Sequence, residues 1–148
     1  MDWLDAHLAF AEHQARARAK PNLAESRAQQ ALVRLAWLHR RHPRYGIIYE
    51  CLHSIPNGAD VDQQNRERLV AEGLSAGYPD LGLDLARGGY HGMRLEMKSA
   101  AGRLSDKQRL WRARLEREGY HYVLARDSAQ AWQALCAYVD GVVVRVIP

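Results

Sequence analysis

The stretch PDLGLDLARGGYHGMRLEMK, residues 79–98, decides the fold of this chain. Polar and apolar residues alternate over residues 80–86 and again over residues 93–99. Such alternation is typical of β-strands with one buried face. Between the two runs stands Arg87-Gly88-Gly89-Tyr90, in which the glycines suit a tight turn. The stretch therefore predicts two antiparallel strands joined as a hairpin.

The alternation also predicts which charged side chains share a face of the hairpin. Side chains two positions apart on a strand point to the same side, so Arg94, Glu96 and Lys98 lie on one face. If the hairpin is centred on Gly88, Asp80 lies directly opposite Glu96, with Cβ atoms about 4.5–5.5 Å apart. A shift of the pairing by one residue would destroy this arrangement, because it exchanges the two faces.

Two carboxylates at this spacing repel each other unless a cation lies between them. Oxygen ligands so placed suit Mg²⁺ or Mn²⁺, which keep several waters and accept phosphate oxygens. Lys98, one step along the same face, is suited to orient an attacking water and to stabilise charge on a phosphate. The spacing alone favours the alternative of an exposed hairpin whose Lys98 forms a surface ion pair with Asp80 or Glu96.

The rest of the chain predicts helices and further strands around this hairpin. Periodicity, turns and caps indicate helices at 3–18, 23–41, 62–72, 105–118 and 129–138, and strands at 45–53, 120–125 and 142–147. This order predicts an α/β domain with a mixed central sheet flanked by helices. We expect the domain to span residues 21–148, after an N-terminal helical extension over residues 1–20.

Composition limits the class of protein. A chain of 148 residues with 47% hydrophobic residues is long and apolar enough for one folded domain. No apolar run approaches the roughly 18 residues of a membrane span, and the N-terminus lacks the features of a signal peptide, so we expect a cytoplasmic protein. The net charge of +4 gives a mild preference for polyanions.

A wider set of motifs resembles the PD-(D/E)xK nucleases, and the VRR-NUC family in particular. The matching pieces follow one another over roughly residues 23–140 and are Asn57-Gly58, Glu72-Gly73-x-x-x-Gly77-x-Pro79-Asp80-Leu81, Leu95-Glu96-x-Lys98, Gly102-Arg103-Leu104-Ser105-x-x-Gln108, Gly119-Tyr120, and a closing helix with Ala131 and Tyr138. The resemblance implies a restriction-endonuclease-like fold.

The resemblance also implies roles for individual residues. Asp80, Glu96 and the backbone carbonyl of Met97 would be metal ligands, and Lys98 would be the catalytic lysine. Gln108 matches a glutamine that these nucleases hold near the site, although its place in a Ser-x-x-Gln capping box explains it equally well.

These nucleases also carry a glutamate on the helix before the first strand, as a further metal ligand and catalytic residue. Glu25 matches it best and Glu12 less well. A plain surface glutamate is the alternative at either position.

Basic residues surround the start of the helix at 105–118 and are candidates for DNA binding: Arg103, Lys107, Arg109 and Arg112. They predict a track for a DNA backbone, and the alternative is an ordinary solvated helix face. The apolar residues Leu110, Trp111 and Leu115 are expected to pack into the core.

The resemblance implies a Mg²⁺- or Mn²⁺-dependent endodeoxyribonuclease, bacterial or phage-encoded, that acts as a homodimer on branched DNA. Resolution of four-way (Holliday) junctions is the favoured activity. The alternatives are a flap- or end-directed nuclease, a catalytically silent nucleic-acid-binding module and a purely structural α/β domain.

Overall fold

A four-stranded sheet forms the centre of the molecule in the computed structural model, which describes residues 23–56 and 62–146. The strands are β1 (Leu52–Ser54), β2 (Leu81–Leu83), β3 (Met93–Met97) and β4 (His121–Ala125), in that order across the sheet. β1 and β3 both run antiparallel to β2, whereas β3 and β4 are parallel. This mixed sheet with flanking helices confirms the predicted fold class.

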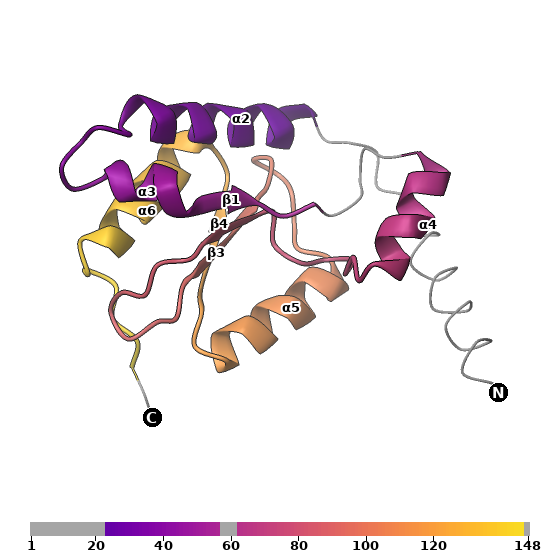
Figure 1. The fold of residues 1–148 in the computed structure, drawn as a ribbon. Helices are drawn as coiled ribbons and strands as arrows, with labels where there is room; N and C mark the ends of the chain where they lie inside the picture. The colour runs from indigo at the N-terminus through magenta and orange to yellow at the C-terminus, as the bar shows by residue number, and fades with distance from the viewer. Residues whose placement is uncertain (1–22, 57–61, 147–148) are drawn as a thin grey trace.

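Helices cover the sheet on both sides. They are α2 (Leu23–Leu38), α3 (Gly46–Cys51), α4 (Gln63–Ala71), α5 (Asp106–Arg117) and α6 (Ser128–Val139). Figure 1 shows α2 and α5 on opposite sides of the sheet. α6 packs against both α2 and β4, so α2 and α6 together form one layer.

The hairpin has the register that its sequence predicts. Leu81 pairs with Leu95, and Leu83 pairs with Met93, which corresponds to a centre at Gly88. These apolar side chains are at most 2% exposed and belong to the main hydrophobic core. The core is completed from α2 and α6 by Leu32, Ala36, Ala131, Leu135 and Tyr138. The opposite face of the hairpin is thus left for the charged residues.

The strand predicted at 45–53 is wrong for most of its length. The chain forms α3 over Gly46–Cys51, and only Leu52–Ser54 is a strand. The helical turn buries Ile48 completely, and Gly46 donates to the carbonyl of His42. Burial against the sheet therefore outweighs the β-propensity of this segment, as tertiary packing often does.

The strand predicted at 142–147 is not formed over residues 142–146, and its last residue lies outside the described part. Val142, Val144 and Val146 are exposed, and Arg145 N–H donates to the Gly88 carbonyl. The segment meets the hairpin turn rather than a strand. Gly88 permits this approach, because a Cβ there would lie 1.9 Å from the oxygen of Val143.

The apolar residues of α5 differ from the expectation in one case. Leu115 is buried and Trp111 is partly buried, but Leu110 is 58% exposed. The N-terminal extension expected at residues 1–20 lies outside the described residues. Within the part of the chain that the structure describes, no helix is long and apolar enough to cross a membrane.

We predict that Leu135→Ala lowers the free energy of unfolding by about 2–5 kcal/mol, because it leaves a cavity where α6 packs on the sheet. Leu135 has no exposed surface. Leu110→Ala, the matched change at an exposed leucine, should stay within about 0.5 kcal/mol of wild type. Urea unfolding followed by circular dichroism measures both, and equal losses would contradict the assignment of the core.

Candidate active site

Glu96 lies at the centre of the charged face, near the end of β3. Its side chain is 1% exposed. Nζ of Lys98, two residues further along the chain, lies 3.0 Å from Glu96 Oε1. The lysine is itself largely buried, with 12% of its side chain exposed. The alternative of an ion pair on an open surface therefore does not describe this contact, which lies in the interior.

Asp80 is held beside this pair by the backbone of β3. Its Oδ2 accepts a hydrogen bond of 2.8 Å from Met97 N–H. The carbonyl of Asp80 in turn accepts from Ile55 N–H, just past the end of β1. The carboxylate of Asp80 is thus fixed at the sheet end, next to Glu96 and Lys98.

Gln108 connects the start of α5 to Glu96. Its side-chain oxygen accepts a hydrogen bond of 2.9 Å from the backbone N–H of Ser105. The backbone N–H of Gln108 donates to Ser105 Oγ, which completes the capping box. Its side-chain nitrogen donates to Glu96 Oε1. The structural role and the site contact expected for Gln108 therefore occur together, each through a different atom of the amide.

Gly77 lets the loop before Asp80 pack against the first turn of α5, which carries Gln108. Its φ of +84° is a conformation that favours glycine. A Cβ here would lie 2.7 Å from the Cβ of Lys107 and 2.9 Å from the backbone nitrogen of Gln108. Glycine thus allows the loop to lie directly on the first turn of α5.

The electrostatics of Glu96 reflect its surroundings. Burial raises its pKa from 4.5 to about 7, and the nearby charge of Asp80 adds to the increase, as does that of Glu25. Lys98 lowers the pKa of Glu96 and so offsets part of these increases. Glu96 Oε2 is buried and has no hydrogen-bond partner among the described residues. The site therefore holds more negative charge than its own lysine compensates.

Glu25 contacts the site from the first turn of α2. Its Oε1 accepts a 2.9 Å hydrogen bond from Ser99 N–H, in the residue after Lys98. Glu12, the weaker candidate, lies outside the described residues. In the described ranges, no three Asp, Glu, His or Cys side chains are grouped closely enough to hold a metal ion by themselves. A metal at Asp80 and Glu96 would need backbone, water or phosphate oxygens as well.

The basic residues near α5 are engaged to different degrees. Arg109 pairs with Asp106 and donates to the carbonyl of Leu104, and Arg112 pairs with Glu116 at 3.0 Å. Arg103 is exposed, and Lys107 is partly buried. Much of the charge on α5 is thus matched within the helix.

Arg94 lies on the face of Glu96, as the alternation predicts, and it is buried there and pairs with Asp84 at 3.1 Å. Arg126, just after β4, was not identified from the sequence, and it contacts three carbonyls of the loop after Lys98. The spacing of Arg126 gives no signal, since Arg126 and its partners are 24 to 27 residues apart in the sequence.

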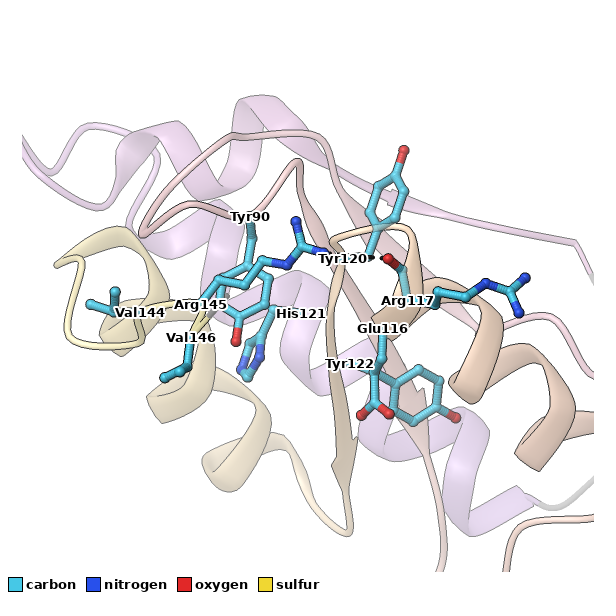
Figure 2. Close-up of a pocket in the computed structure, with 9 residues that line it drawn as sticks. All are labelled: Tyr90, Glu116, Arg117, Tyr120, His121, Tyr122, Val144, Arg145 and Val146. Carbon is cyan, nitrogen blue, oxygen red and sulfur yellow. Dashed lines mark hydrogen bonds between the residues drawn. The ribbon is translucent and has the colours of Figure 1, made fainter. Parts of the chain in front are cut away.

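A hollow of about 540 Å³ lies near the other end of β4. Its lining comes from the end of α5, from β4 and from the C-terminal segment: Tyr90, Glu116, Arg117, Tyr120, His121, Tyr122, Val144, Arg145 and Val146 (Figure 2). None of the predicted site residues in the described ranges lines it. The hollow is therefore separate from the charged cluster around Glu96.

We predict that the stabilising contribution of Glu96 to the metal-free protein is lost as the pH rises from about 4.5 to about 7. Folding raises the pKa of Glu96, so in this range the folded state keeps a proton that the unfolded chain has lost. Glu96→Gln should remove about 1–3 kcal/mol of this pH dependence. Urea unfolding in EDTA, at about pH 5 and about pH 8, measures the effect.

Glu50→Gln is the matched control, because Glu50 is exposed on α3. Its pH dependence should equal that of wild type. A Glu96→Gln protein with the same pH dependence as wild type would show that burial does not hold the proton on this residue.

Comparison with known proteins identifies the family of the chain. The family model of the VRR-NUC domain matches residues 16–129. A solved structure of a VRR_NUC domain protein is 26% identical, with a TM-score of 0.65, and the match covers 81% of this chain and 91% of that chain. No curated protein matches. Because the family model covers more than half of the sequence, the chain belongs to the VRR-NUC domain family, whose members are nuclease-type, DNA-processing domains.

Proposed function

We propose that this protein is a metal-dependent endonuclease that hydrolyses phosphodiesters in branched DNA. The observation that carries the proposal is the buried Glu96 carboxylate, which contacts Lys98 and Gln108. Asp80 is fixed to the adjacent backbone at Met97. Acceptors and a cation gathered at one sheet end are what hydrolysis of a phosphodiester requires.

The residues at the site fit a divalent cation such as Mg²⁺ or Mn²⁺. Asp80 and Glu96 are hard oxygen donors, and the buried Glu96 Oε2 has no partner in the described chain. The backbone carbonyl of Met97 is the further candidate ligand, and Glu25, which is not grouped with Asp80 and Glu96 closely enough for direct binding, would contact the ion through a bound water. When bound, the metal neutralises phosphate charge and lowers the pKa of a bound water.

The other residues of the cluster have separate tasks in this proposal. Lys98 supplies a positive charge for the developing charge on the phosphate and orients the attacking water. Gln108 holds Glu96 in one orientation, since its amide is itself fixed by Ser105. The end of β3 and the first turn of α5 hold these groups on regular elements, which favours catalysis over a site built on loops alone.

The DNA-binding surface proposed here is formed by Arg103, Lys107, Arg109 and Arg112. Arg103 precedes the capping box that holds Gln108 and Lys107 lies within it, so a DNA backbone bound there would pass beside the cluster. We propose a homodimer and a four-way junction as substrate. A twofold dimer would present two sites to a symmetric junction.

We predict that the wild-type protein cuts a labelled four-way junction in Mg²⁺ or Mn²⁺ and not in EDTA. Asp80→Asn and Lys98→Ala should each lower the single-turnover rate constant by at least about 100-fold. The measurement is cleavage of junction, flap and linear duplex DNA side by side.

Asp84→Asn is the control for Asp80→Asn, because Asp84 is 65% exposed and pairs with Arg94 rather than with the backbone of Met97. It should retain most of the activity. Cleavage of flap DNA alone would show that the protein is a flap nuclease that uses the same active site. Binding of DNA without cleavage in any metal would overturn the enzymatic function and leave a binding module.

We predict that Arg103→Ala weakens DNA binding and makes it less dependent on salt. Loss of one phosphate contact should lower the slope of log Kd against log salt by about 1. Fluorescence anisotropy over a salt series measures the slope. Arg34→Ala, at an exposed arginine of α2, should leave it unchanged; an unchanged slope for Arg103→Ala would remove that residue from the surface.

A further inference from the structure

The loop after Lys98 connects two parts of the proposed site. It begins at Ser99, the residue after Lys98, and leads through Gly102 to Ser105, where the capping box that holds Gln108 begins. Both Lys98 and Gln108 contact the same oxygen of Glu96. The conformation of this loop therefore affects the relative positions of two groups that meet at one carboxylate.

Arg126 holds this loop from the end of β4. One guanidinium nitrogen, Nη1, lies 2.7 Å from the carbonyl oxygen of Ser99, 3.0 Å from that of Ala100 and 2.9 Å from that of Gly102, so its two hydrogens are shared among three acceptors. Bonds from a charged donor are stronger than those between neutral groups. A single side chain thus gathers three carbonyls of the loop around one positive charge.

The backbone near Arg126 is itself fixed. Arg126 N–H donates to Gln130 in α6 at 3.0 Å, and the carbonyl of Ala125 accepts from Lys98 N–H at 2.9 Å. The paired residues of β3 and β4 end at Met97 and Ala125, and beyond them the guanidinium of Arg126 keeps the two chain segments together. Lys98 is tied to β4 by its own backbone on one side and by its following loop on the other.

Glu25 holds the same loop with the opposite charge. Its carboxylate accepts from Ser99 N–H at 2.9 Å, while Arg126 binds the carbonyl of Ser99. An anion on the N–H and a cation on the carbonyl of one residue restrain both of its peptide groups.

Close packing links the loop to the lysine side chain. A Cβ on Gly102 would lie 3.3 Å from Cδ of Lys98, so the aliphatic part of the lysine lies against the loop. A movement of the loop would change the space available to that side chain.

From these contacts we infer that Arg126 is a positioning residue for Lys98, and the inference rests on the nuclease function proposed above. Arg126 acts through the loop and not on the substrate. The arginine suits this task because its rigid, planar donors keep their charge at any ordinary pH, whereas lysine offers a flexible point charge.

The test compares Arg126→Ala and Arg126→Lys with wild type and with the control Arg34→Ala. The first readout is independent of cleavage: NMR of protein labelled at lysine ¹³Cε, in which the three lysines give few signals. The Lys98 signal, assigned with Lys98→Ala, should shift or broaden in Arg126→Ala, while that of Lys107 stays unchanged. Arg126→Lys should give a smaller change.

The second readout is single-turnover cleavage of the four-way junction at saturating enzyme. Arg126→Ala should lower the rate constant by about 10- to 100-fold, as expected for a misplaced catalytic group, with Kd for DNA changed by less than about twofold. Guanidinium ion at a non-denaturing concentration should restore part of the rate to Arg126→Ala and none to Lys98→Ala.

Three outcomes would overturn the inference. An unchanged Lys98 signal in a folded Arg126→Ala protein would show that the loop does not position the lysine. A weaker Kd with an unchanged rate at saturation would make Arg126 a DNA contact instead. An equal decrease of the cleavage rate constant in Arg34→Ala would indicate that the loss of any positive charge has this effect.

The inference about Arg126 can also be tested if the wild type does not cleave DNA or if Arg126→Ala does not fold. If wild type does not cleave DNA, the nuclease proposal fails, and the Lys98 signal alone decides whether Arg126 positions the lysine. If Arg126→Ala does not fold, Arg126→Lys takes its place in both measurements.

Discussion

The carboxylate of Glu96 lies in the interior of the protein, where a charge is stable only beside cations and hydrogen-bond donors. Lys98 and Gln108 supply these at Oε1, and Oε2 has no partner in the described chain. Burial and the nearby charge of Asp80 raise the pKa of Glu96 to about 7, and Lys98 offsets only part of this increase. β3 supplies Glu96, the residue that follows β3 supplies Lys98 and α5 supplies Gln108, so these parts of the fold meet at this one group.

Gln108 shows how one residue joins the folding of a helix to the geometry of a site. A helix N-terminus leaves backbone N–H groups without partners, and the capping box satisfies them. Here the glutamine amide uses its oxygen for Ser105 and its nitrogen for Glu96. The start of α5 is therefore fixed relative to β3 by a local rule of helix capping. Gly77 then lets the loop before Asp80 lie against the same turn.

Local patterns predicted the parts of this structure that depend on neighbours in sequence. The hairpin register followed from alternation around Gly88, and the capping box at Ser105 followed from its spacing. The segment around Ile48 was misjudged, because its helical turn is favoured by burial that propensity cannot describe. The contacts of Arg126 were equally out of reach, since they depend on the parallel pairing of β3 with β4, which brings distant segments together.

The same physics explains why a fold would keep so unfavourable a cluster. The negative charge of Asp80 disfavours a second negative charge on Glu96, and Lys98 offsets only part of this repulsion. Interactions that would relieve this repulsion permanently, such as a second buried lysine, would also occupy the place of a cation or a phosphate. A site that is poorly compensated alone gains stability from whatever binds it, because a ligand of the folded state stabilises that state. Rigid supports are then needed elsewhere, and the opposite charges of Glu25 and Arg126 on the loop at Ser99 supply one of them.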